Sequence, residues 1–277
     1  MEPEVQVFYV PKFGNSEEEY EDAAAYQAPT RRFAVADGAT ESSFADAWAR
    51  SLVRQYTVQP PLTPPNGTPL HEWVIPLQRE WHASIKWDKL PWFAEEKARS
   101  GAFAAFLGLH FVGGTAAVVR PSFFGRLLRR KPSAGTLRWH ALAVGDSCLF
   151  HVRADRLLKA FPLDSSKSFN DRPLLISSNP ARNQSVWRAV QLAQGDCRSG
   201  DWFLLATDAL SKWFLSQYEA GGKPWQTLRE LRSSADFTAS VDKLRAEGSL
   251  KNDDTTLLMI NWTGVQTAEV PQKISIP

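Results

Sequence analysis

Several short apolar segments of this chain end in an aspartate that has small residues beside it. Residues 33–37 read FAVAD, residues 141–146 read ALAVGD and residues 202–208 read WFLLATD. Asp253 stands just before the apolar segment TTLLMI, and Glu21–Asp22 opens the segment EDAAAY. Carboxylates at strand ends are costly to bury unless a cation lies between them, because neighbouring carboxylates repel one another. The pattern therefore predicts a cation site built from acids that lie far apart in the chain.

The ligand types indicate which cation such a site would hold. Aspartate and backbone carbonyl oxygens favour Mg²⁺ or Mn²⁺ over zinc, and the small residues Gly38, Ala39 and Ala209 leave room for bound water. Cys148 and His151 do not predict a zinc site, because no second pair of ligands accompanies them. A single aspartate at a strand end is more often a turn or cap residue, and open parallel α/β folds also gather such aspartates.

Apolar segments rich in β-branched and aromatic residues predict strands along most of the chain. Amphipathic segments between the later strands predict helices near 209–218, 225–232 and 239–247. Strands on both sides of a long helical region indicate an α+β fold built on antiparallel sheet. The expected strands are 5–10, 31–36, 115–119, 137–144, 148–152, 202–206 and 256–260.

Two helical regions are expected in the first half of the chain. The first follows Thr40, a candidate N-cap, and carries apolar residues four positions apart on one face. The second runs from about His71 to Leu109 with a break near Pro91, and a proline-rich connector at about 57–70 separates the two. The uncharged stretch 100–119 could span a bilayer by length, but its glycines favour the end of a buried helix followed by a strand.

Composition excludes some classes of partner. Among the 277 residues the formal net charge is +2, which provides no bulk field for nucleic acid or for an anionic membrane. The cysteines, Cys148 and Cys197, fit a reducing compartment, and Glu2 and Glu4 stand where a secretory leader would carry basic residues. We expect a cytoplasmic protein with no membrane span. The basic run at about 121–135 is expected to be a solvated loop, with a docking element as the alternative.

Six motifs follow one another in an order typical of one enzyme family. They are EDA (21–23), FAVADGA (33–39), GGTAAVV (113–119), AVGDS (143–147), FLLATDAL (203–210) and NDDTTLLMI (252–260). Together they resemble the PP2C (PPM) family of metal-dependent protein serine/threonine phosphatases. The resemblance implies a single domain over 1–277 with an α-β-β-α sandwich, in which two antiparallel β-sheets are flanked by helices and a two-metal centre lies at one end.

The resemblance also implies roles for the acids that match the family motifs. Asp37 matches the aspartate that bridges both metals, and the carbonyl oxygen of Gly38 would bind one of them. Asp208 and Asp253 match further ligands of the first metal, although Asp254 could exchange roles with Asp253. Asp37 and Asp208 are the residues expected to be essential for catalysis.

The remaining acids are implied around the second metal and around a weaker third one. Glu21 and Asp22 match the Glu-Asp motif near the second metal, where either binds directly or through water. Asp146, together with Asp208, matches the acids that hold a third ion in some members. The implied cofactors are two Mn²⁺ or Mg²⁺ ions with a possible third. The full ligand set is Glu21, Asp22, Asp37, Gly38, Asp146, Asp208 and Asp253.

The implied activity is hydrolysis of phosphoserine or phosphothreonine by a metal-activated water. The implied partners are a phosphoprotein substrate and a cognate bacterial Ser/Thr kinase, and the enzyme is expected to be a monomer. Ala39 stands where many eukaryotic members have a histidine, and no arginine precedes the Glu-Asp motif. Lys12 could hold phosphate in its place, but a solvated lysine at a strand end is the favoured interpretation. These departures leave two alternatives open, a pseudophosphatase that acts as a binding or regulatory module and a metal hydrolase of small phosphate esters.

Overall fold

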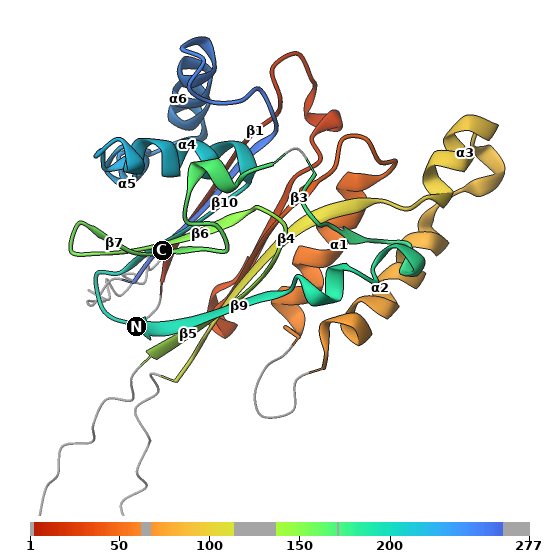
Figure 1. Ribbon diagram of the computed structural model, residues 1–277, viewed down its shortest axis with the longest axis horizontal. Coiled ribbons are helices and arrows are strands. Elements are labelled where there is room, and N and C mark those ends of the chain that lie inside the picture. Colours follow the sequence, from red (N-terminus) through yellow and green to blue (C-terminus); the bar gives the residue numbers. More distant parts are fainter. Residues whose placement is uncertain (1–2, 62–67, 114–136, 171, 263–277) are drawn as a thin grey trace, which may run out of the picture.

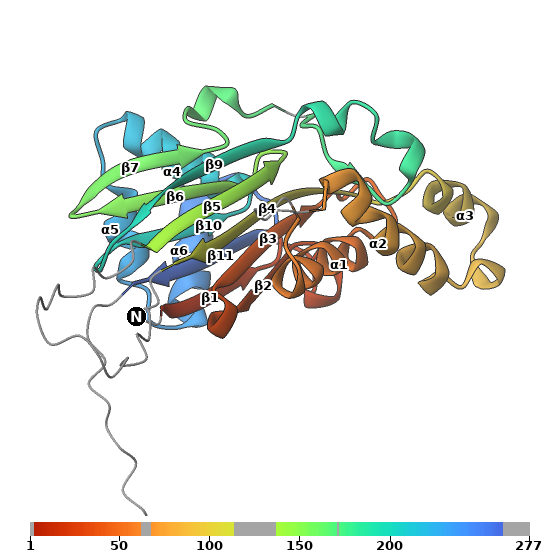
Figure 2. The same ribbon diagram turned by 90° about the horizontal axis from the view of Figure 1, so that it is seen from below.

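The computed structural model of this chain describes residues 3–61, 68–113, 137–170 and 172–262. Within these ranges the strands form two antiparallel sheets, and helices lie on both sides of the resulting sandwich (Figures 1 and 2). The expected α-β-β-α sandwich is therefore confirmed. Among the helices that the structure describes, none is both long and apolar enough to cross a membrane.

The first sheet, sheet A, contains both the first and the last strand of the described chain. Its strands, in spatial order, are β1 (Glu4–Val10), β11 (Thr255–Asn261), β10 (Trp202–Ala206), β6 (Cys148–Arg153) and β7 (Arg156–Phe161). The second sheet, sheet B, runs in the order β2 (Ala23–Gln27), β3 (Arg32–Gly38), β4 (Phe103–Val112), β5 (Leu137–Val144) and β9 (Gln191–Cys197), and β8 (Ile176–Ser177) pairs with β4.

The helices form the two outer layers. α1 and α2 cover sheet B, and α4, α5 and α6 cover sheet A, as Figure 1 shows. α3 extends from the α2 side of the molecule. The bounds are α1 (Ala45–Val58), α2 (Leu70–Ser84), α3 (Trp92–Arg99), α4 (Asp208–Glu219), α5 (Pro224–Arg229) and α6 (Ser234–Ala246).

Apolar side chains fill three layers between these elements. Between the sheets, Phe33, Phe203 and Trp262 lie in one cluster of fully buried side chains. Under α1 and α2, apolar residues that recur every four positions along α2 pack against sheet B, among them Trp73 and Trp81. The tryptophan-rich face of α2 is thus core packing, in agreement with its spacing.

The predicted helix from His71 to Leu109 is wrong in its last part. α2 and α3 are helical and Pro91 caps α3, but Phe103–Val112 is the strand β4, between β3 and β5. β4 is buried on both faces, and an apolar run of that kind has no periodicity that separates a strand from a buried helix. The predicted strand 115–119 and the basic run at 121–135 lie outside the described residues.

Smaller differences between the predicted and the observed elements concern the bounds of α1 and four strands. Thr40 does not cap α1, which begins at Ala45 after Phe44 in the left-handed conformation. Thr57 and Val58 belong to α1, so the proline-rich connector begins at Gln59. β2, β7, β8 and β9 are not among the expected strands, because each of these strands is short, polar or rich in alanine.

Candidate metal centre

Strand register brings the predicted aspartates to one end of the sandwich. Asp37 pairs with Ala105 on β4, and the next residue of β4, Phe106, pairs with Val144 at the end of β5. The turn after β5, which contains Asp146, therefore lies at the same end of sheet B as the end of β3, with β4 between the two strands. In sheet A, β10 and β11 are antiparallel, so the end of β10 lies beside the start of β11. Asp208, which follows β10, and Asp253, which precedes β11, therefore lie at the same end of the sheet.

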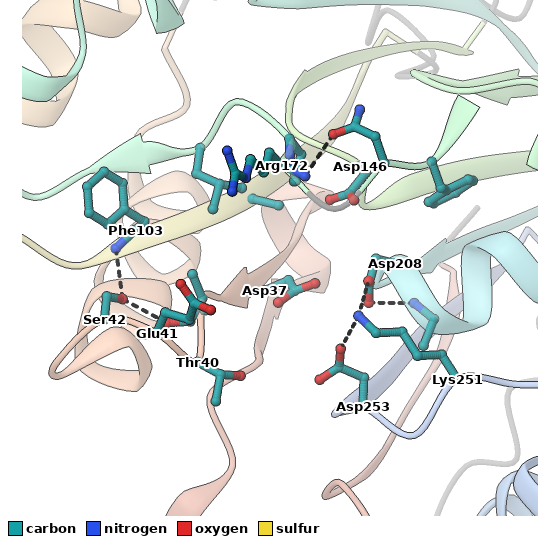
Figure 3. Close-up of a pocket in the computed structure, with 18 of the residues that line it drawn as sticks. Asp37, Thr40, Glu41, Ser42, Phe103, Asp146, Arg172, Asp208, Lys251 and Asp253 are labelled. Atoms are coloured by element: carbon teal, nitrogen blue, oxygen red, sulfur yellow. Dashed lines mark hydrogen bonds and ion pairs between the residues drawn. The ribbon is translucent and has the colours of Figure 1, made fainter. Parts of the chain in front are cut away.

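These carboxylates line one cavity of about 550 Å³ (Figure 3). Asp37 and Gly38 come from β3, and Asp146 comes from the β5–β6 turn. Asp208 comes from the first turn of α4, and Asp253 precedes β11. Five of the seven predicted ligand residues thus lie around one space, although they come from four separate segments of the chain.

Burial and mutual repulsion disfavour the charged forms of these acids. Burial raises the pKa of Asp37 well above its ordinary value, and the charges of Asp22 and Asp208 raise it further. Burial also raises the pKa of Asp146 to about 7, with a further contribution from Asp208. The pKa of Asp208 is raised by burial, against the opposing charge of Lys251. A divalent cation would relieve this repulsion.

Asp22 is buried and is not among the residues that line the cavity. Its Oδ2 atom accepts hydrogen bonds from the hydroxyls of Thr207 (3.0 Å) and Thr256 (2.7 Å). Its Oδ1 atom is buried and has no hydrogen-bond partner among the described residues. Burial raises the pKa of Asp22 well above its ordinary value. A buried carboxylate oxygen without a partner is costly, and a bound cation or water would satisfy it.

Glu21 does not line the cavity, but its backbone shapes it. A Cβ atom at Gly38 would lie 2.6 Å from the carbonyl oxygen of Glu21, so only glycine allows β3 to approach this segment. The side chain of Glu21 is half-buried, and burial raises its pKa. The structure therefore brings Glu21 next to Gly38 without placing its carboxylate among the cavity-lining acids.

The two neighbouring acids before β11 have different surroundings. Asp254 accepts hydrogen bonds from the backbone N–H groups of Lys12 and Glu21, each at 2.7 Å, and so ties the segment after β1 to β11. Asp253 instead lines the cavity. The geometry favours Asp253 as the ligand, and Lys12 is held through its backbone and does not line the cavity.

A lysine that the sequence analysis did not identify lies among the carboxylates. The Nζ atom of Lys251 is 2.5 Å from Oδ2 of Asp253 and 3.5 Å from Oδ2 of Asp208 (Figure 3). Burial disfavours its charged form, but the two carboxylates outweigh this, so the pKa of Lys251 is raised. Arg172 and Lys212 also line the cavity. The only sequence signal for Lys251 is its place two residues before Asp253.

The donor set fits a hard divalent cation. It consists of carboxylate oxygens and the Gly38 carbonyl, with mutual repulsion and one unpartnered buried oxygen. Among the residues that the structure describes, however, no three His, Cys, Asp or Glu side chains already have the arrangement needed to hold a metal ion. The ligands are therefore gathered at one cavity but not closed around a centre.

The architecture is that of the PP2C (PPM) phosphatases, so the fold that the motifs predicted is confirmed. No protein-family model matches the sequence, and no curated protein matches it. Solved structures at 12–15% sequence identity share the architecture of this chain.

Three of these structures illustrate the likeness. The Mycobacterium tuberculosis serine/threonine phosphatase PstP/Ppp has a TM-score of 0.58 at 15% identity, over 95% of this chain and 100% of that one. The PstP catalytic domain in complex with two manganese ions has a TM-score of 0.57 at 14% identity, over 95% and 99%. PppA, a regulatory component of the T6SS in Pseudomonas aeruginosa, has a TM-score of 0.53 at 15% identity, over 94% and 98%.

Proposed function

We propose that this chain is a metal-dependent phosphatase that hydrolyses phosphoserine or phosphothreonine in a protein substrate, with Mn²⁺ or Mg²⁺ as cofactor. The observation that carries the proposal is the cavity in which Asp37, Asp146, Asp208 and Asp253 meet from four segments of the chain. The PP2C fold and a manganese-bound structure of the same fold support it. A cytoplasmic location, a cognate kinase, a monomeric state and a single domain over 1–277 belong to the same proposal.

The residues divide into two groups by charge. Asp37, the Gly38 carbonyl, Asp208 and Asp253 would hold the ions. Asp22 would contribute through its unpartnered Oδ1 atom, and Asp146 would help Asp208 to hold a third ion. Bound divalent cations supply a reactive nucleophile at neutral pH and neutralise charge on the phosphoryl group. Arg172 and Lys212 lie on the cavity wall, where their positive charges would attract and orient a phosphate group. Ala39 provides no proton for the leaving oxygen.

A pseudophosphatase that keeps the fold as a binding module is the second candidate. One observation favours it, the lysine between Asp208 and Asp253. The enzyme remains the better-supported function, because a binding module has no need to keep four repelling carboxylates around one cavity.

Hydrolysis of p-nitrophenyl phosphate and of a phosphothreonine peptide tests the proposal. Mn²⁺ should support turnover and EDTA should abolish it. Asp37→Asn and Asp208→Asn should each lower kcat/KM by about a hundredfold or more, because each removes a direct ligand. Asp196→Asn, on the exposed side of β9, removes the same charge away from the cavity and serves as the control.

The outcomes separate the candidates. Turnover of the peptide above that of free sugar phosphates supports a protein phosphatase, and the reverse preference supports a hydrolase of small esters. Binding of Mn²⁺ in calorimetry without turnover of any substrate would establish the binding module instead.

A further inference from the structure

The side chain of Lys251 connects two carboxylates that belong to different segments of the chain. Lys251 lies in the turn between α6 and β11, and its Nζ atom contacts Oδ2 of Asp253 and Oδ2 of Asp208. Asp208 is contributed by α4, so the ammonium group joins segments that are more than forty positions apart in the chain. Figure 3 shows the ammonium group between the two acids at the side of the cavity.

The ammonium group contacts the oxygen of each carboxylate that has no backbone hydrogen bond among the described residues. Oδ1 of Asp208 already accepts the N–H of Ala209 at 2.5 Å, and Oδ1 of Asp253 accepts the N–H of Asp254 at 3.1 Å. The Oδ2 atoms accept no hydrogen bond from a backbone N–H group of the described residues, and both are in contact with Lys251. A compact positive charge between two carboxylates relieves the same repulsion that a divalent ion would relieve.

We infer that Lys251 is a tethered competitor for the metal centre, and that a divalent cation must displace its ammonium group to bind Asp208 and Asp253 together. This inference rests on the proposed metal-dependent function. The lysine side chain is 60% exposed, so it can leave the acids without disturbing the core. Displacement would leave its charge at the edge of the same cavity.

Calorimetric titration of the full chain with Mn²⁺ tests the inference. In Lys251→Met the affinity for Mn²⁺ should rise about five- to thirtyfold, because one or two partly exposed ion pairs no longer compete. Lys251→Arg keeps the charge and should stay within about threefold of the wild type. Lys212→Met is the matched control, since Lys212 lines the cavity but makes no ion pair with any described residue. Its Mn²⁺ affinity should rise by less than that of Lys251→Met.

Thermal unfolding gives an independent readout. Without metal, Lys251→Met should unfold at a lower temperature than the wild type, because the repulsion between Asp208 and Asp253 is then unrelieved. Saturating Mn²⁺ should raise its unfolding temperature by more than it raises that of the wild type.

Each outcome decides the inference. Equal or weaker Mn²⁺ binding by Lys251→Met overturns it, as does an equal gain in Lys212→Met, which would reflect net charge alone. If no variant and no wild-type protein binds Mn²⁺, the metal centre itself is refuted, and the competition with it. If wild-type protein binds Mn²⁺ and hydrolyses phosphate esters while Lys251→Met binds no more tightly, only the role of Lys251 fails.

Discussion

The raised pKa of Asp146 makes the cost of burying carboxylates at the cavity measurable without metal. The residue is 7% exposed, and its pKa is raised from 3.8 to about 7 by burial and by the charge of Asp208. Between about pH 3.8 and pH 7, Asp146 therefore keeps its proton in the folded state, whereas it has already released it in the unfolded chain. By linkage, the free energy of unfolding must fall as the pH rises between these two pKa values.

The size of the effect follows from the two pKa values. Between pH 5 and pH 8 the shift of Asp146 removes about 2–3 kcal/mol from the free energy of unfolding. Asp146→Asn keeps the shape of the side chain and cannot ionise. In EDTA, the stability of this variant relative to the wild type should therefore increase by about 2–3 kcal/mol from pH 5 to pH 8.

Urea unfolding followed by tryptophan fluorescence provides the assay. The two proteins are compared at each pH because His110 has the opposite effect on stability. Burial lowers the pKa of His110 to about 4, so this residue makes the fold more stable as the pH rises toward 6.5. That contribution is common to both proteins and cancels in the difference. A difference in unfolding free energy that stays constant from pH 5 to pH 8 would show that Asp146 is not held in a strained environment.

Two further predictions concern stability. Asp254→Ala should lower the free energy of unfolding by about 3 kcal/mol, because two backbone N–H groups lose a charged acceptor. Asp253→Ala should lower it by less than about 1 kcal/mol. If urea unfolding in EDTA ranks the two variants in the opposite order, the assignment of Asp253 to the cavity is contradicted. Gly108→Ala should cost about 1–3 kcal/mol in thermal or urea unfolding, because its Cβ atom would overlap the buried ring of Tyr56, and an unchanged stability would show that α1 can move away from β4.

Much of the site was visible in local sequence. A carboxylate at the end of an apolar strand is recognisable from a few neighbouring residues, so Asp37, Asp146 and Asp208 could be identified as a set from those residues alone. The order of the motifs then predicted the sandwich, and the solved structures of the same fold confirm it. The assignment of individual ligands to individual ions remains a prediction.

Local sequence could not resolve the features that depend on neighbours from other segments. β4 is buried on both faces by residues distant in sequence, so its composition did not distinguish it from a helix. Asp253 and Asp254 are chemically identical, and they differ only because the backbone after β1 and at Glu21 approaches one of them.

The sequence by itself therefore determined the chemical types available at the site: oxygen ligands, small neighbours and a near-neutral chain. The tertiary structure decided which of those acids face the cavity, which one bonds to backbone, and that Lys251 reaches between two of them. The physical reason is that charge and burial act through space over a few ångströms, whereas sequence motifs record only neighbours along the chain.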